Sequence, residues 1–187
     1  LMTHDEVFSI ADYLSLRDGG EFSYRPTTLF VYHPCDDALL SALELEGRGW
    51  QVQPSRRVLT TELVTGMDEL GVLLAGHARN AYWFGSQLTI EEARRHVPQS
   101  NATSLQVAAG ALAAAVYALR HPRLGVREAD ELDHAECLAV ARPYLGALVG
   151  AYTDWTPLQG RGQLFDEDLD PDHPWQLRNV RARQWRA

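Results

Sequence analysis

The spacing of apolar residues predicts several helices along the chain. The first is expected to begin near His4, because Thr3 and Glu6 have the three-residue separation of a capping box and apolar residues then recur at helical intervals through Leu14. Thr89 and Glu92 repeat that separation ahead of a short helix that Pro98 ends. Further helices are predicted over residues 36–45, 101–119 and 133–141.

Short runs rich in β-branched and aromatic residues predict strands. They cover residues 27–32, 50–52, 58–61 and 70–74, and Gly or Pro residues separate them. The strands come early and most helices late, without regular alternation. This order predicts an α+β fold, in which helices pack on a mixed sheet.

The apolar segment 101–119 is expected to be a buried helix whose small residues allow a sheet or a twofold-related helix to approach closely. Its uncharged apolar part, residues 107–119, is shorter than the roughly 20 residues needed to span a bilayer, so no membrane contact is expected. From residue 152 the chain becomes polar and proline-rich. We therefore predict a main domain over residues 1–151 and an irregular extension over residues 152–187.

Composition narrows the possible functions. The 187 residues are 45% hydrophobic and 22% charged, which is typical of a folded soluble domain. All 17 basic residues are arginine, so no lysine of this chain can form a Schiff base. The net charge of −8 disfavours nucleic acid and favours cationic partners. Two cysteines and the lack of a signal-peptide pattern at the start of the sequence predict a cytoplasmic setting.

Common cofactor motifs are not found in the sequence. The two Gly-x-Gly pairs, at Gly47 and at Gly160, lack the third glycine of a dinucleotide fingerprint, and there is no Walker motif. Two His/Cys segments, at His33 and at His134, offer zinc ligands, but their spacing matches no standard zinc site, so no metal is expected. The acidic run 165–172 lacks the glycine of a calcium loop and is interpreted as surface charge.

His4 and Glu6 admit two interpretations. A histidine that titrates near neutrality beside a carboxylate can bind an amine and move its proton. Alternatively, Glu6 caps its own helix and His4 is an exposed residue of the first turn. Among the aromatic residues, Trp50, Trp83 and Tyr117 are expected in the core, and Trp155 and Trp175 as docking anchors of the extension.

Seven segments, taken in order, resemble the carboxy-terminal part of bacterial homospermidine synthase, a saccharopine dehydrogenase-like family. They span nearly the whole chain. These segments are Thr3-His4-Asp5-Glu6, Tyr24-Arg25-Pro26-Thr27, Tyr32-His33-Pro34-Cys35-Asp36, residues 68–74, Asn101-Ala102-Thr103, residues 153–158 and Asp172-His173-Pro174-Trp175-Gln176.

The resemblance implies an enzyme that uses NAD as a recycled hydride carrier to join putrescine units, or putrescine and spermidine, through imine intermediates. It implies a polyamine substrate and a homodimer. The family's glycine-rich NAD site lies in an amino-terminal Rossmann portion that these residues do not include. The chain alone is therefore expected not to bind NAD, and the extension 152–187 is expected to pack on that Rossmann portion.

By position, the family's His-x-Glu pair falls on His4 and Glu6. The resemblance implies that His4 moves a proton during imine exchange and that Glu6 also binds an ammonium end of the substrate. His33 and Asp36 are further candidates for substrate binding. The alternative is a non-catalytic domain for dimerisation or polyamine binding.

Overall fold

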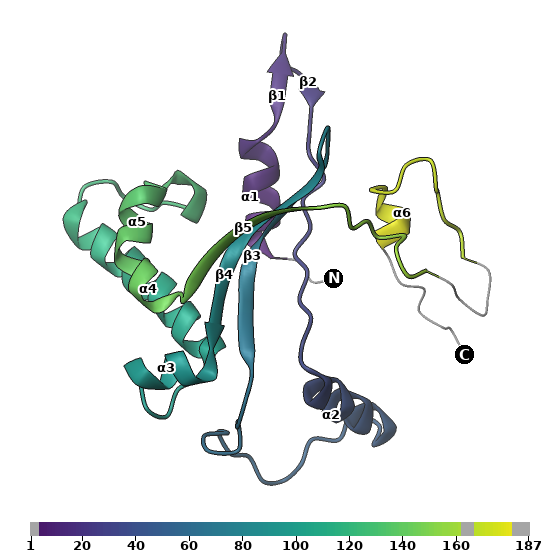
Figure 1. The fold of residues 1–187 in the computed structure, drawn as a ribbon. Coiled ribbons are helices and arrows are strands. Elements are labelled where there is room, and N and C mark those ends of the chain that lie inside the picture. Colours follow the sequence, from purple (N-terminus) through teal and green to yellow (C-terminus); the bar gives the residue numbers. More distant parts are fainter. Residues whose placement is uncertain (1–3, 162–166, 181–187) are drawn as a thin grey trace. The chain divides into compact units, whose positions relative to one another are not determined.

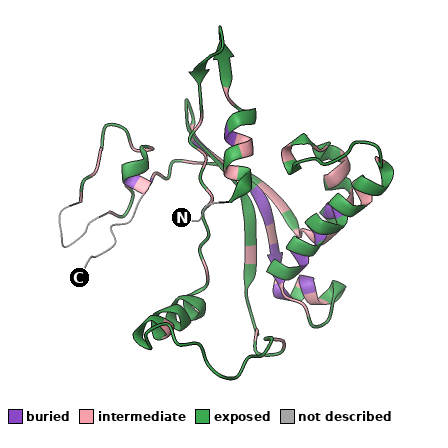
Figure 2. Cartoon of the chain, turned by 180° about the vertical axis from the view of Figure 1, so that it is seen from behind, coloured by how far each residue is buried: buried purple, intermediate pink, exposed green. Residues whose placement is uncertain are grey.

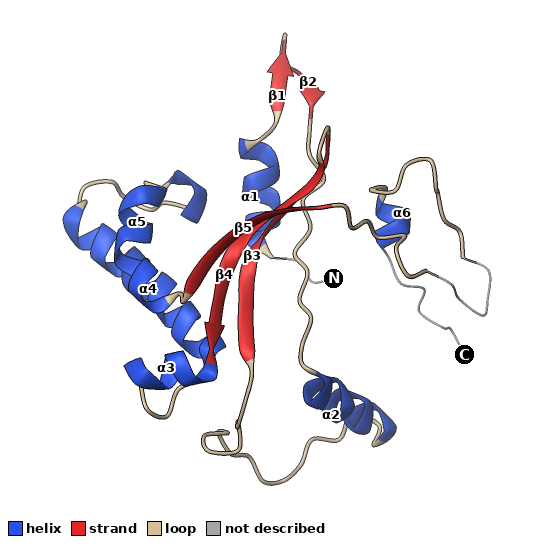
Figure 3. Ribbon diagram, viewed as in Figure 1, coloured by secondary structure: helices blue, strands red, loops and turns tan. Residues whose placement is uncertain are grey.

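The structure is a computed structural model that describes residues 4–161 and 167–180 (Figure 1). The chain divides into two compact units. One consists of Leu1–Glu62 and Gly110–Ala141, and the other consists of Leu63–Ala109 and Arg142–Ala187. Helix α4 (Ala102–Arg120) contributes residues to both units. The α+β class predicted from the sequence is confirmed (Figure 3).

The first unit begins with helix α1 (Asp5–Tyr13) and a two-stranded hairpin, β1 (Leu16–Asp18) and β2 (Glu21–Tyr24). Helix α2 (Asp36–Gly47) follows a long irregular segment. The second half of α4, the short helix η1 (Ala129–Glu131) and helix α5 (His134–Ala141) complete the unit. The hairpin was not predicted. Its turn depends on Gly19 and Gly20, which both have the positive φ angles that glycine tolerates best.

The second unit is built on a three-stranded sheet in the order β3-β4-β5, formed by β3 (Met67–His77), β4 (Asn80–Thr89) and β5 (Ala147–Thr153). The prediction of a mixed sheet is wrong for the described residues, because all their strand pairs are antiparallel. A two-residue turn joins β3 to β4 and leaves only the antiparallel pairing possible. Strand 70–74 was predicted correctly and lies inside β3.

Two glycines let the sheet's Trp83 lie flat across neighbouring strands. Gly71 on β3 and Gly85 on β4 are directly opposite each other. A Cβ atom at Gly71 would lie 2.6 Å from the Trp83 ring, and one at Gly85 would lie 2.7 Å from it. The ring therefore occupies the space that two side chains would otherwise fill, as expected for a tryptophan that packs within its own sheet.

The core of the second unit lies where helices α3 and α4 meet the end of β4 (Figure 2). Helix α3 (Ile90–His96) begins with the predicted capping box: Thr89 Oγ1 accepts from the Glu92 backbone N–H, and Glu92 accepts from that of Thr89. The hydrogen bonds that the Glu92 carboxylate accepts from the Thr89 backbone N–H and hydroxyl lower its pKa. Gln106 is buried in the same core and donates to Ser86 Oγ. The core residues are Leu88, Ala93, Ala102 and Leu105, with Tyr144 packed against them.

Three predicted strands do not form. Residues 50–52 and 58–61 have no strand structure, and within 27–32 only Phe30 makes an isolated bridge. Figure 3 shows these segments as loops on either side of α2. Their side chains have high β-propensity, but propensity is realised only when a neighbouring strand supplies partners. Helices 36–45 and 133–141 were predicted correctly, within two residues at each end.

Helix α4 was predicted correctly in position but not in burial. Its buried residues include Leu105, Ala109 and Ala113, whereas Val107 and Leu119 are 66% and 82% exposed. By length and composition alone, the nineteen-residue helix could cross a membrane, with a mean hydropathy of 1.5, but a core helix of a soluble protein meets the same criterion, so this is weak evidence. The sequence argument from length was wrong, because the polar residues before Val107 carry no charge and the helix includes them.

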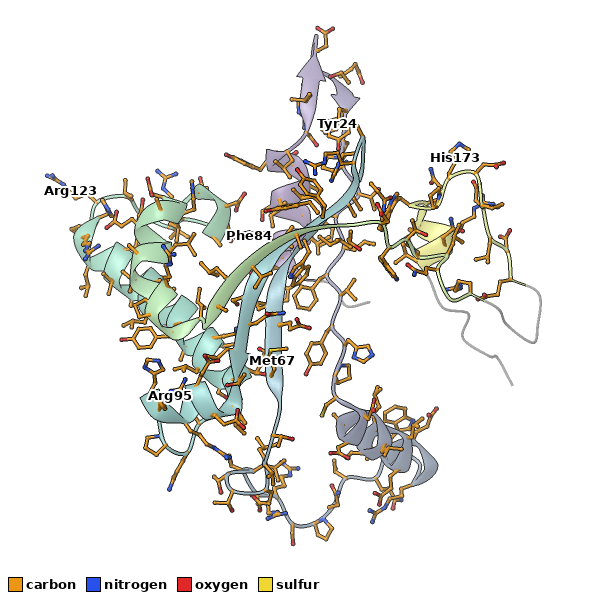
Figure 4. All side chains as sticks on the ribbon, viewed as in Figure 1. Tyr24, Met67, Phe84, Arg95, Arg123 and His173 are labelled. Carbon is orange, nitrogen blue, oxygen red and sulfur yellow. The ribbon has the colours of Figure 1, made fainter. Side chains whose placement is uncertain are left out.

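The predicted extension starts inside strand β5, and its described residues between β5 and helix α6 (Leu177–Val180) form no further helix or strand. Asn179 is fully buried and holds this segment together: its Oδ1 accepts from the Asp170 backbone N–H, and its Nδ2 lies 2.8–3.1 Å from the carbonyls of Asp170, His173 and Pro174. Figure 4 shows His173 in the loop before α6. The proposed boundary between residues 151 and 152 stays a prediction.

Candidate functional site

The candidate site is at the start of α1, where His4 and Glu6 contact each other. His4 is the residue before the helix and has extended backbone angles, with φ −138° and ψ 147°. This conformation turns its side chain toward Glu6, and His4 Nδ1 lies against Glu6 Oε2. The two side chains are 48% and 47% exposed, so solutes can reach the pair.

Phe30 completes the site from the irregular segment that follows β2. Its ring stacks on the His4 imidazole with centroids 4.8 Å apart and an interplanar angle of 18°. This separation is within the range of favourable offset stacking. Phe30 is half-buried, and sequence reasoning did not single it out. The two residues are 26 positions apart, and no local pattern links them.

The capping interpretation of Glu6 does not fit the helix that forms. Helix α1 begins at Asp5, so His4 is the N-cap and Val7 is the third helical residue. Glu6 is one position too early for the capping box predicted with Thr3, a residue that lies outside the described residues. The carboxylate instead contacts the His4 ring. Both Asp5 and Glu6 carry negative charge at the positive end of the helix dipole, which stabilises them there.

The pairing determines which imidazole nitrogen is available for chemistry. An ionised carboxylate only accepts hydrogen bonds, so Nδ1 of His4 must carry the proton that it shares with Glu6. In the neutral ring this leaves the lone pair on Nε2. The arrangement can therefore take a proton at Nε2, and Glu6 balances the positive charge that results.

His33 and Asp36 are less well placed for a common site. Both are exposed, and His33 lies in the irregular segment three residues after Phe30. Asp36 is the first residue of α2. Among the described residues, no hydrogen bond or ring contact joins either of them to His4 or Glu6. Their predicted role in substrate binding stays a prediction.

The two His/Cys segments do not come together as a zinc site. Cys35 is exposed at the start of α2, and Cys137 is partly buried in α5. Burial, with Glu136 and Asp133 nearby, raises the pKa of the Cys137 thiol, which keeps it protonated and a poor ligand. Within the described part of the chain, no group of three or more His, Cys, Asp or Glu side chains is arranged to hold a metal ion.

A second histidine–carboxylate pair joins α4 to α5. His121 Nε2 lies 2.8 Å from Glu136 Oε2, Arg120 Nη1 donates to Glu136 Oε1 at 3.0 Å, and the Tyr117 ring lies 4.3 Å from that of His121. No sequence pattern predicted this pair, because its members are 15 positions apart. Both Glu136 oxygens are engaged by the chain's own His121 and Arg120, which indicates a structural role.

Acid should weaken this connection between α4 and α5. Hydrogen bonds from His121 and Arg120 lower the pKa of Glu136, so its contribution to stability is complete above the ordinary carboxyl pKa of about 4.3 and is lost as the pH falls through the lower folded value. We expect Glu136→Gln to lower Tm at pH 7, and the Tm difference from wild type to shrink below about pH 4. Thermal unfolding followed by circular dichroism measures both effects.

The matched control for Glu136 is Glu21→Gln, which removes an exposed carboxylate from β2. Its Tm should follow that of the wild type across the same pH range. A Glu136→Gln variant that kept the same Tm deficit at pH 3 as at pH 7 would contradict an ionic contribution.

The two tryptophans of the extension pack within the second unit. Trp155 and Trp175 are in edge contact at 5.8 Å, and Trp175 Nε1 donates to Asn80 Oδ1 at the β3–β4 turn. The Asn80 amide in turn donates to the carbonyls of Thr153 and Trp155. These hydrogen bonds are all with the chain's own sheet, and the role of the two tryptophans as docking anchors stays a prediction. In the acidic run, Glu167 accepts two hydrogen bonds from Arg161, and the two side chains are only 15% and 20% exposed, so the interpretation as surface charge is wrong for Glu167.

Comparisons with known proteins give a consistent match. No protein-family model matches the chain. It is 56% identical over 184 residues to homospermidine synthase of Blastochloris viridis and 52% identical over 185 residues to that of Mesorhizobium japonicum. The match covers 98% of this chain but only 39% and 38% of these relatives. A crystal structure of the Legionella pneumophila homospermidine synthase in complex with NAD aligns with a TM-score of 0.90 at 47% identity, covering 98% of this chain and 40% of that one.

Proposed function

The chain is homologous to the carboxy-terminal two fifths of bacterial homospermidine synthases, and we propose that it forms the part of such an enzyme that carries the His4–Glu6 proton-transfer pair. The contact between His4 Nδ1 and Glu6 Oε2 is the observation that carries the proposal. The reaction proposed is the transfer of an aminobutyl group between amines, with putrescine as substrate and homospermidine as product.

The substrate's chemistry fits the charges at the start of α1. Putrescine is a dication. Asp5 and Glu6 place two negative charges in the first turn of α1, and the last turn of this helix has no basic residue that would repel a cation. The chain's net charge of −8 adds a long-range attraction for cations. Glu6 can bind one ammonium group while His4 Nε2 accepts a proton from the amine that must become nucleophilic.

We propose that the NAD-dependent hydride transfer is carried out by the part of the enzyme outside the aligned segment. The structure of the Legionella protein is a complex with NAD, but the sequence here contains no complete Gly-x-Gly-x-x-Gly motif. Gly47 is the last residue of helix α2 and Gly49 follows it, whereas a dinucleotide-binding turn runs from a strand into a helix. We therefore assign NAD to the remaining three fifths of the relatives' length. That portion is also proposed to meet the extension 152–187.

A chimaeric enzyme tests this proposal directly. Residues 1–187 replace the aligned segment of the Blastochloris viridis homospermidine synthase, and homospermidine formed from putrescine in the presence of NAD is measured by mass spectrometry. We expect turnover within about tenfold of the parent enzyme, since 56% of the aligned residues are identical. A folded chimaera that makes no homospermidine would refute the proposal.

The second candidate function is dimerisation. Leu70, Val72 and Leu74 share one face of the sheet with Phe84 and Tyr152, by register, and all five are 47–59% exposed. Figure 4 shows Phe84 on this sheet. Monomers rarely leave so large an apolar group uncovered. We propose a homodimer, and a chimaera that sediments as a monomer would contradict it.

We also propose a cytoplasmic setting, without membrane or nucleic acid as a partner. Cys35 and Cys137 are free thiols, as expected in a reducing compartment. One face of α4 packs on protein through Leu105 and Gln106, which donates a hydrogen bond to Ser86. We propose that the exposed face of α4 contacts other protein residues and not a lipid bilayer. Fractionation of the native host, with the chain found in the membrane pellet, would contradict this setting.

A further inference from the structure

The His4 side chain needs restraint that its own helix does not give. His4 is the N-cap of α1, yet its ring makes no capping bond to the helix backbone. Nearly half of the side chain is exposed. Glu6 fixes the position of one ring atom, Nδ1, but a single hydrogen bond leaves the ring free to pivot about that atom.

Phe30 supplies the missing restraint. Its ring lies almost parallel to the imidazole, at an interplanar angle of 18° and a centroid separation of 4.8 Å. Stacking fixes the plane of the imidazole, whereas the bond to Glu6 fixes its rotation within that plane. Together these two contacts determine the direction in which Nε2 points.

We propose that Phe30 is a positioning residue that holds the His4 imidazole in the orientation required for proton transfer at Nε2. This inference rests on the proposed function of the His4–Glu6 pair. In the step concerned, an N–H bond of the substrate ammonium breaks and its electron pair stays on nitrogen as the free amine. The proton bonds to Nε2, and Glu6 balances the imidazolium charge until the proton is returned to the departing amine.

The aromatic ring suits both states of this cycle. A phenyl face stacks on a neutral imidazole and also attracts an imidazolium cation. An aliphatic side chain of similar size would fill the space but would make neither interaction as well. The restraint therefore persists when His4 gains and loses its proton, which an ionic partner in place of Phe30 would not allow.

The test uses the chimaeric enzyme and compares Phe30→Leu with Phe30→Tyr. We expect Phe30→Leu to lower kcat about tenfold with KM for putrescine changed less than twofold, because misorientation affects the proton transfer and not the ammonium contact. Phe30→Tyr keeps the stacked ring and should restore kcat to within about twofold of the parent. Phe22→Leu, which removes a phenyl ring from strand β2, is the control and should change neither constant.

A double-mutant cycle separates positioning from structural support. In a His4→Ala background, Phe30→Leu should cause no further loss of kcat, since there is no imidazole left to orient. An equal tenfold loss in that background would show that Phe30 is merely structural and would overturn the inference. If Phe30→Leu does not fold, Phe30→Met, which keeps the bulk without the ring, takes its place in the cycle.

The two hypotheses fail in different ways. An inactive parent chimaera would refute the proposed function itself. An active chimaera whose kcat is unchanged by Phe30→Leu or Phe30→Met would refute only the role of Phe30 and leave the His4–Glu6 pair in place.

Discussion

His4→Ala in the chimaeric enzyme is expected to lower kcat by about 10²- to 10⁴-fold, the range over which a positioned general acid–base contributes to catalysis. The imidazole is the group at this site that is proposed both to take and to return the proton at Nε2. Alanine cannot perform either step. KM for putrescine should change little, because the Glu6 carboxylate, the proposed contact of the ammonium group, remains.

Glu6→Gln should affect both constants. The amide keeps an oxygen that accepts from His4 Nδ1, so the ring stays oriented, but it lacks the charge that is proposed to stabilise the imidazolium and to bind the ammonium. We expect kcat to fall about tenfold or more and KM for putrescine to rise by a similar factor. Steady-state rates over a range of putrescine concentrations measure both changes.

Asp5→Asn is the matched control for these variants. It removes one negative charge from the same helical turn and leaves the His4–Glu6 contact intact. A small rise in KM is the expected result, since only long-range attraction is weakened. If His4→Ala and Glu6→Gln both behaved like Asp5→Asn, with turnover nearly unchanged, the assignment of the catalytic pair would be wrong.

Local signals in the sequence predicted helix starts well. The capping box of Thr89 and Glu92 forms as predicted, because every atom that it needs lies within four residues of the chain. The same spacing at Thr3 and Glu6 gave a helix that starts one residue later than the box requires. There the Glu6 carboxylate contacts the His4 ring. The spacing alone does not distinguish this contact from a capping box.

Longer-range features could not be predicted. Residues i and i+2 do not face each other within a helix, so the His4–Glu6 contact depends on His4 adopting an extended backbone just outside it. Phe30 reaches the same place from a segment that was expected to be a strand. Strand formation there would need a neighbouring strand, and sequence patterns do not specify which segments become neighbours.

Burial was the least predictable property. Helix 101–119 and Trp50 were expected to be buried, but Leu119 of α4 is 82% exposed and Trp50 is 68% exposed. An apolar side chain favours burial, but its sequence position does not indicate which residues will cover it. The match covers only 39% of one of the relatives, and we propose that the rest of such a relative supplies part of that cover.

The second large effect concerns NAD binding and activity when the chain is purified without the rest of such an enzyme. Purified alone, the 187-residue chain is expected to bind NAD no better than an unrelated acidic protein and to make no homospermidine, whereas the chimaera does both. The reason is physical: a dinucleotide site needs a glycine-rich turn between a strand and a helix, and neither Gly47-x-Gly49 nor Gly160-x-Gly162 provides one with a third glycine.

Isothermal titration with NAD, followed by mass spectrometry of incubations with putrescine, measures this difference. The Legionella enzyme serves as the positive control for NAD binding. A chain that retains its circular dichroism spectrum yet gives no heat with NAD would fit a division of labour in which these residues supply proton transfer and the remainder supplies hydride transfer. Homospermidine formed by the isolated chain would contradict that division, because its own residues would then have to hold the cofactor as well as the His4–Glu6 pair.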